Sequence, residues 1–232
     1  NGNLFLLDLP NKNFDKINNH LRKISKIKIE NIKCDLLDKE QINKFITKFK
    51  KSKIKLDVLI NNAAFVGSSD LEGWNTNFEK QSIDTYEKAL NLNLTTAFNL
   101  SKGLYPNLKK GKGGSIINIS SIYGFLSPDY SLYKGTNMNV PAAYSTSKAG
   151  LIQLTRWLAS TCAPEVRVNS ISPGGILNKQ NPNFIKRYNK KTLLGRMGNP
   201  EDFKGIIAYL STNLSSYTTG QNFIVDGGLS IK

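Results

Sequence analysis

Short apolar runs alternate along the chain with longer stretches in which apolar residues recur every three or four positions. The runs predict strands, and the periodic stretches predict helices packed on one side. The predicted strands cover residues 4–7, 28–34, 58–60, 115–119, 166–171 and 222–225, and the predicted helices cover 14–26, 39–50, 83–104, 142–160 and 201–211. Pro106 is expected to end the helix over 83–104. Because strands this apolar cannot face water, the pattern predicts an α/β fold with a doubly wound parallel sheet.

Three polar segments interrupt the alternation. Residues 65–80 and 127–141 carry glycine, asparagine and aromatic residues, and each follows the end of a predicted strand. Ligands of open α/β sheets bind at such strand ends, so both segments are candidate ligand-binding loops. Residues 178–200 follow the strand over 166–171 and are a candidate substrate lid. No internal repeat or linker divides the chain, which predicts a single domain over residues 1–232.

The composition fits a globular protein, since 39% of the 232 residues are hydrophobic and 21% are charged. No apolar run approaches the roughly 18 residues of a membrane span, and the first residues lack the basic start of a signal peptide. Two cysteines, Cys34 and Cys162, and a single histidine, His20, argue against a disulfide framework, a Cys/His metal site and histidine-based catalysis. We therefore expect a cytoplasmic protein with no bound metal and no membrane partner.

The net charge of +15 raises the question of nucleic-acid binding. Many of the lysines, however, lie on helical stretches such as residues 39–55, between apolar Ile42, Phe45 and Phe49. This spacing describes a solvated face above a packed one. Lysine far outnumbers arginine, although arginine suits base and phosphate recognition better. No nucleic-acid partner is expected.

Tyr144 and Lys148 form the pair with the clearest chemistry. They are four residues apart in a predicted helix, so they share one face about one turn apart. A neighbouring cation lowers the pKa of a tyrosine from about 10, and the phenol can then exchange a proton with an alcohol or carbonyl. Tyr130 and Lys134 have the same spacing, but Gly135 follows at once and no helix is expected there.

Further motifs surround this pair in a fixed order. They are Asn61-Asn62-Ala63-Ala64, Leu92-Asn93-Leu94, Ser121, the stretch from Arg167 to Gly174, and Asp226-Gly227-Gly228. Together with Tyr144 and Lys148 they resemble the short-chain dehydrogenase/reductase family, in which the first motif ends in glycine instead of Ala64. The resemblance implies a Rossmann-like NAD(P)-binding domain that transfers hydride between nicotinamide and a secondary alcohol or ketone.

The resemblance also implies a role for each matching residue. Tyr144 would exchange the proton with the substrate oxygen, and Lys148 would lower the pKa of Tyr144 and bind the nicotinamide ribose. Ser121 would orient the substrate oxygen, and Asn93 would hold a water that links Lys148 to solvent. Further positions implied to contact the cofactor are Asn61, Ala63, Pro173, Gly174 and Ile176. Asn178 stands where family members often have threonine.

Asp8, at the end of the first predicted strand, bears on the choice of cofactor. Its carboxylate can accept both hydrogen bonds of an adenosine ribose diol and would repel a 2′-phosphate. No arginine follows it closely, so NAD is expected rather than NADP. Asp35 matches the family position that meets the adenine amino group.

The opening strand of the family and its Gly-rich turn do not occur in the sequence, which begins where the family has its second strand. We expect roughly 30 residues to precede those given, because a chain without them would leave strand edges unpaired. A chain that truly lacked them would be a non-catalytic module, which is one alternative interpretation.

The insertion over residues 127–141 bears on the substrate, because it sets Ser121 and Tyr144 farther apart than is usual in the family. Its polar groups suit a polyhydroxylated substrate, and we expect Tyr123, Asp129 and Tyr133 to contact it. The segment resembles bacterial oxidoreductases of nonulosonic-acid and other surface-glycan synthesis, including flagellin modification. The alternative is a 3-oxoacyl-(acyl-carrier-protein) or general secondary-alcohol reductase. The family also implies a homotetramer or homodimer, packed through the helices that contain Asn93 and Tyr144.

Overall fold

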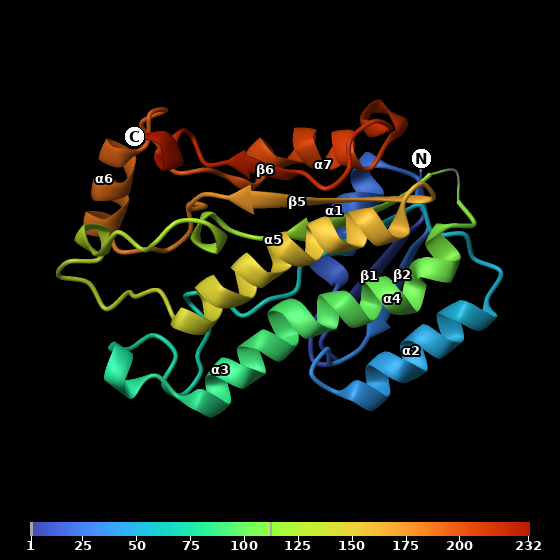
Figure 1. Cartoon of the computed structure of the whole chain (residues 1–232), viewed down its shortest axis with the longest axis horizontal. Coiled ribbons are helices and arrows are strands. Elements are labelled where there is room, and N and C mark those ends of the chain that lie inside the picture. Colours follow the sequence, from blue (N-terminus) through green and yellow to red (C-terminus); the bar gives the residue numbers. More distant parts are fainter. Residues whose placement is uncertain (1, 112) are drawn as a thin grey trace. The chain divides into compact units, whose positions relative to one another are not determined.

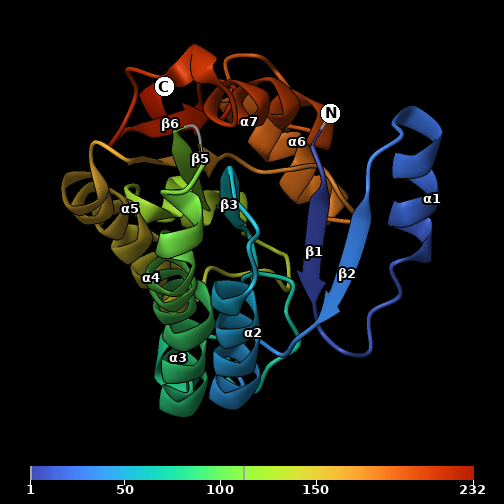
Figure 2. The same cartoon turned by 90° about the vertical axis from the view of Figure 1, so that its right-hand side faces the viewer.

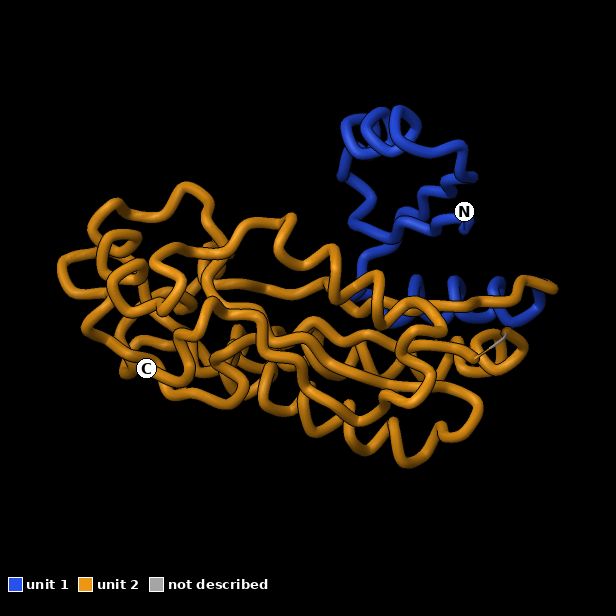
Figure 3. Tube along the Cα trace, turned by 90° about the horizontal axis from the view of Figure 1, so that it is seen from above, with its two compact units in different colours: residues 1–52 blue, residues 53–232 orange. Residues whose placement is uncertain are grey.

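The computed structural model describes residues 2–111 and 113–232 and shows an α/β protein (Figure 1). The chain divides into two compact units, residues 1–52 and 53–232 (Figure 3). Each unit contains its own parallel sheet. No helix within the described ranges is both long and apolar enough to cross a membrane.

The smaller unit is a strand–helix–strand–helix arrangement. Its strands β1 (Leu4–Asp8) and β2 (Ile29–Lys33) pair in parallel, and its helices are α1 (Asp15–Ile24) and α2 (Lys39–Lys51). Asp38 caps α2 by accepting hydrogen bonds from two backbone N–H groups of the first turn. These elements agree with the predicted ranges to within two residues at each end.

The larger unit contains a four-stranded parallel sheet in the order β3-β4-β5-β6. The strands are β3 (Val58–Asn61), β4 (Gly114–Ile119), β5 (Val166–Pro173) and β6 (Asn222–Val225). Val58 pairs with Ser115, Gly114 with Val166, and Ser170 with Asn222. This parallel order brings the carboxyl ends of all four strands to one edge, where the candidate active-site segments begin.

Helices cover both faces of this sheet, as the doubly wound prediction requires (Figure 2). On one face pack α4 (Thr96–Leu108) and α5 (Ala142–Cys162), and on the other packs α7 (Lys204–Leu210). The side chain of Ile116 packs in the core beneath α4 and α5, and that of Ile117 packs in the core beneath α7. Both side chains are fully buried. Successive strand residues thus supply opposite cores, which explains why β4 is apolar throughout its centre.

The helix predicted over 83–104 is not continuous. After α3 (Ile83–Leu90) comes a π-helical turn (Asn91–Thr95), and α4 follows. The predicted end at Pro106 is wrong, because α4 continues through it to Leu108. A proline this close to the helix end removes a single backbone hydrogen bond. Burial of Leu104 and Leu108, which are 3% and 0% exposed, favours the continuation.

The segment over 178–200 contains a helix that the periodicity did not predict. This helix, α6 (Pro182–Lys191), begins with a side-chain cap from Asn181 and a proline in its first turn. The helix predicted over 201–211 starts as a 3₁₀ turn (Pro200–Phe203) and continues as α7. Other 3₁₀ turns are Phe78–Lys80, Ile122–Gly124, Tyr130–Leu132, Asn213–Ser215 and Leu229–Ile231.

Candidate active site

Tyr144 and Lys148 lie in the first two turns of α5. Lys148 is only 3% exposed, and its Nζ donates a hydrogen bond of 2.7 Å to the carbonyl oxygen of Ile119 at the end of β4. The same Nζ lies 5.8 Å from the centroid of the Tyr144 ring. The sequence predicted that this cation lowers the pKa of Tyr144, but the net shift in the structure is upward.

Burial changes the pKa of both groups. It lowers the pKa of Lys148 to about 8 and raises that of Tyr144, and a hydrogen bond with Ser121 partly opposes the second effect. Near neutral pH Tyr144 is therefore a protonated phenol, and Lys148 is mostly charged. The effect of Ser121 on this pKa indicates that two hydroxyl groups, those of Ser121 and Tyr144, lie near each other.

Ser121 is held by the turn that follows β4. Its Oγ accepts a hydrogen bond of 3.2 Å from the backbone N–H of Tyr123. Gly124 allows this turn to approach α5, because a Cβ there would lie 2.9 Å from the backbone carbonyl group of Lys148. Ser120 adds a hydrogen bond of 2.8 Å from its Oγ to the carbonyl oxygen of Lys148. The turn that carries Ser121 is thereby fixed to the helix that carries Lys148.

Asn93 links the loop after β3 to α5. It lies in the π-helical turn and is 2% exposed. Its Oδ1 accepts from the backbone N–H of Phe65 at 2.8 Å, and its Nδ2 donates to the carbonyl oxygen of Phe65 at 3.3 Å and to Oγ of Ser147 at 3.0 Å. These bonds leave its own helix, unlike the local backbone bond that a helix-interior asparagine often forms.

The second tyrosine–lysine pair has a different setting. Tyr130 lies in a 3₁₀ turn that ends at Leu132, before Lys134 is reached. No α-helix of the described chain joins the two, as expected from Gly135. Tyr130 is also 61% exposed, whereas Lys148 is 3% exposed.

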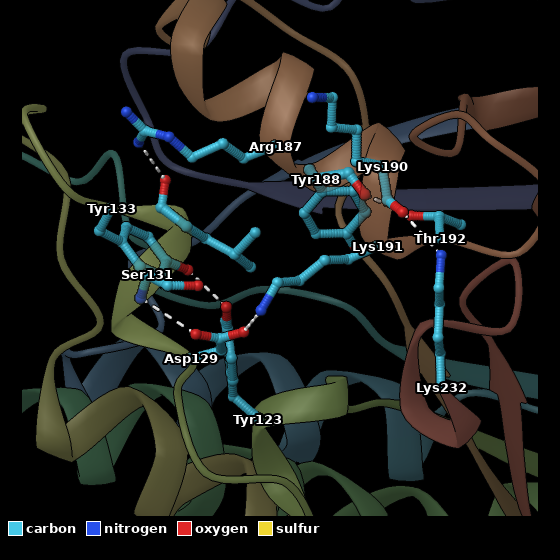
Figure 4. Close-up of polar contacts among 11 residues, drawn as sticks. Tyr123, Asp129, Ser131, Tyr133, Arg187, Tyr188, Lys190, Lys191, Thr192 and Lys232 are labelled. Carbon is cyan, nitrogen blue, oxygen red and sulfur yellow. Dashed lines mark hydrogen bonds and ion pairs between the residues drawn. The ribbon is translucent and has the colours of Figure 1, made fainter.

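The three residues expected to contact substrate, Tyr123, Asp129 and Tyr133, lie in one cluster (Figure 4). The hydroxyl groups of Tyr123 and Tyr133 are hydrogen-bonded to each other, and burial raises the pKa of both. The carboxylate of Asp129 pairs with Lys191 of α6 and accepts from the backbone N–H of Ser131, which together lower its pKa. The polar atoms of this cluster are therefore engaged with one another.

Residues of α6 that the sequence did not single out hold the insertion in place. Arg187 donates a hydrogen bond of 3.0 Å to the carbonyl oxygen of Leu132 (Figure 4). The ring of Phe184 packs 5.2 Å from the ring of Tyr133, measured between centroids. The available signal was the spacing of Phe184 and Tyr188, two aromatic residues on one helical face.

The backbone beyond β5 is tightly packed. A Cβ on Gly174 would lie 2.8 Å from Cα of Asp226, and one on Gly175 would lie 2.8 Å from the ring of Tyr188. The hydroxyl of Tyr188 accepts from the backbone N–H of Gly175, and burial raises its pKa to about 12. Beyond these glycines the side chain of Ile176 is 37% exposed.

The larger unit offers groups that suit a nicotinamide nucleotide. The bond to Ile119 uses one of the three N–H groups of Lys148, so further donors remain for ribose hydroxyls. The buried Oδ1 of Asn61 has no hydrogen-bond partner within the described residues, and Ala63, two residues later, is exposed. A buried acceptor without a partner is costly unless a ligand satisfies it.

The smaller unit carries the two predicted adenosine-binding carboxylates. Asp8 is exposed, and one of its oxygens accepts from the backbone N–H of Leu9. Asp35 is partly buried and accepts from the backbone N–H of Leu37. Each carboxylate keeps a further oxygen for a ligand hydroxyl or amino group.

A family model described as enoyl-(acyl carrier protein) reductase matches residues 2–230. The chain belongs to the short-chain dehydrogenase/reductase family. This short-chain dehydrogenase/reductase is 30% identical to 3-oxoacyl-[acyl-carrier-protein] reductase FabG of Thermotoga maritima, over 88% of the chain and 78% of that protein. It is also 30% identical to post-translational flagellin modification protein A of Campylobacter coli, over 98% of the chain and 88% of that protein.

Among solved structures, this short-chain dehydrogenase/reductase resembles a short chain dehydrogenase from Leptospira borgpetersenii with bound NAD+. The TM-score is 0.83 and the identity 32%, over 99% of the chain and 93% of that structure. The Rossmann-like fold and the oxidoreductase class predicted from the sequence are thereby confirmed, and the family uses NAD(P).

Proposed function

We propose that this short-chain dehydrogenase/reductase uses NAD to interconvert a secondary alcohol and a ketone on a sugar derivative of surface-glycan synthesis. The observation that carries the proposal is the buried Lys148, whose Nζ lies 5.8 Å from the ring centroid of Tyr144. Bound NAD would supply or take up the hydride. The residues of the chain then have to manage one proton and orient one oxygen.

In the direction of reduction, Tyr144 donates its proton to the substrate oxygen. Ser121 orients that oxygen by a second hydrogen bond, and the charge of Lys148 stabilises the phenolate that Tyr144 becomes. Asn93 holds the loop after β3 against α5. It is also proposed to hold the water that links Lys148 to solvent. Because burial raises the pKa of Tyr144, the resting enzyme is prepared for reduction, and oxidation requires a higher pH.

The choice of NAD rests on Asp8, an exposed carboxylate at the end of β1. It would accept hydrogen bonds from the adenosine ribose and repel the 2′-phosphate of NADP. The Leptospira relative with bound NAD+ supports this choice, and Asp35 is proposed to meet the adenine. Asn61, Ala63, Pro173, Gly174 and Ile176 are proposed as further cofactor contacts.

The choice of a sugar rests on the insertion and on the flagellin-modification relative. Tyr123, Asp129 and Tyr133 remain the proposed substrate residues. Asp129 and Tyr133 also fix the insertion to α6, through Lys191 and Phe184.

A second candidate, 3-oxoacyl reduction, is favoured by the FabG relative. The exposed rings of Phe98 on α4 and Trp157 on α5 are 6.3 Å apart and support the proposed homotetramer.

The test is steady-state oxidation of NADH by the full-length protein with a ketose, a simple ketone and a 3-oxoacyl thioester. The sugar should give the highest kcat/KM. Tyr144→Phe should fold but lose kcat by at least about 100-fold, since proton transfer by a positioned group contributes that much. The matched control Tyr130→Phe should be close to wild type. A preference for the thioester would replace the sugar proposal by the second candidate, and equal losses in both variants would contradict the choice of Tyr144.

A further inference from the structure

The two polar loops that interrupt the α/β alternation are joined to each other. Nδ2 of Asn75 donates to the carbonyl oxygen of Asn137 at 2.9 Å, and Nδ2 of Asn139 donates to the carbonyl oxygen of Thr76 at 2.8 Å. Residues 65–81 and the insertion thus form one lobe beside the N-terminal turn of α5. The four proposed catalytic residues, Asn93, Ser121, Tyr144 and Lys148, all lie outside this lobe.

Between the two loops and α5 lies a cleft of about 690 Å³. Its walls include Phe78, Glu79, Gln81, Tyr130 and Ser145, and none of the four proposed catalytic residues lines it. Such a volume is sufficient for a small-molecule ring with substituents.

The side chains of the cleft indicate what it binds. Phe78 and Tyr130 are 83% and 61% exposed, so two rings are available for stacking. Gln81 accepts from the backbone N–H of Ala142 through Oε1, which leaves its NH₂ group as a donor for a ligand. The Oγ of Ser145 is buried and has no hydrogen-bond partner among the described residues. Aromatic faces flanked by amide and hydroxyl groups suit a ligand with apolar C–H faces and hydroxyl edges.

The charges of the cleft exclude an anionic ligand. The chain has 32 lysines and arginines among 232 residues, yet none of the described residues that line the cleft is basic. The single charged group there is the carboxylate of Glu79. A phosphate or carboxylate would meet repulsion without a compensating cation. A lone carboxylate can also accept hydrogen bonds from two neighbouring hydroxyls.

We propose that this cleft is a subsite for the ring of a neutral saccharide, outside the catalytic centre. The inference rests on the proposed function, in which the substrate is a sugar derivative. One sugar ring would bind at the catalytic centre, and a second ring of the same glycan would bind in this cleft. Phe78 and Tyr130 stack on the ring, and Glu79, Gln81 and Ser145 bond its hydroxyls.

The experiment is titration calorimetry with N-acetylglucosamine, glucose 6-phosphate and n-butylamine as probes. The neutral sugar should bind in preference to the other two, and Phe78→Ala and Tyr130→Ala should each weaken its binding about tenfold. Tyr217→Ala removes another exposed ring, one that does not line the cleft, and should leave binding unchanged. No binding by the wild type, a preference for the phosphate or the amine, or equal affinities in all variants would overturn the proposal.

Turnover of a ketose and a simple ketone, measured on the same samples, separates this proposal from the proposed function. Sugar turnover with no loss of binding in Phe78→Ala would refute the subsite alone. Saccharide binding that depends on Phe78 and Tyr130, together with turnover of the simple ketone only, would refute the sugar substrate of the catalytic centre alone.

Discussion

Asn93 makes the connections on which the candidate active site most depends, and replacing it with alanine should destabilise the protein measurably. The substitution removes the acceptor of the Phe65 N–H and two donations, to the carbonyl oxygen of Phe65 and to Ser147. A buried N–H without an acceptor costs about 1–3 kcal/mol, and each lost neutral bond costs roughly 0.5–1.5 kcal/mol. Because Phe65 is partly exposed, water compensates part of this loss, and we expect about 2–3 kcal/mol.

The assay is urea-induced unfolding followed by circular dichroism, with kcat measured on the same samples. Ser147→Ala is the matched control, because it leaves both bonds between Asn93 and Phe65 intact. It removes the bond from Asn93 and the bond that Oγ of Ser147 donates to the carbonyl oxygen of Tyr144, so we expect a loss of roughly 1–2 kcal/mol. Asn93→Asp keeps an acceptor for the Phe65 N–H but buries a carboxylate oxygen against the Phe65 carbonyl oxygen, so it should be at least as destabilising as Asn93→Ala.

The kinetic result separates positioning from general stability. If Asn93 orders the loop after β3, Asn93→Ala should reduce kcat at temperatures where the variant is fully folded. A free energy of unfolding of Asn93→Ala within about 0.5 kcal/mol of wild type would refute the stabilising role of these hydrogen bonds. Changes of that size are typical of surface positions that make no specific contact.

Two further predictions concern protonation and cofactor choice. Because burial lowers the pKa of Lys148 to about 8 from its ordinary 10.5, the native state releases this proton first as pH rises, so stability should increase from pH 8 towards 10.5. Between pH 7 and 9 the wild type should gain about 1 kcal/mol relative to Lys148→Met in urea unfolding without cofactor, and a constant difference would contradict the lowered pKa. Asp8→Ala should weaken binding of NADH more than of NADPH in fluorescence titrations; an unchanged ratio of the two dissociation constants would remove Asp8 as the selecting group.

The periodicity of the sequence was sufficient to predict the strands and α5, because burial of one or both sides of these elements determines where their apolar residues fall. It was insufficient at Pro106, where the loss of one hydrogen bond is smaller than the gain from burying Leu104 and Leu108. It was also insufficient over residues 182–191, whose few apolar residues include the aromatic pair Phe184 and Tyr188 amid many lysines.

The placement of candidate site residues could be predicted where one short motif determines it. The spacing of Tyr144 and Lys148 placed both in α5. Contacts between distant segments had no comparable signal: the ion pair of Asp129 with Lys191 joins residues 62 positions apart. The sequence does not distinguish a solvent-exposed carboxylate from one in an ion pair, so the partner of Asp129 could be identified only from the structure.

The π-helical turn over Asn91–Thr95 is a place where the chain cannot lose or gain a residue without moving Asn93. Each residue of a helix advances it by about 100°, so deleting one residue from this turn would restore an unbroken α-helix and rotate α3 against α4. Asn93 would then face away from Phe65 and Ser147. Homologous chains should therefore keep the number of residues between α3 and α4 constant.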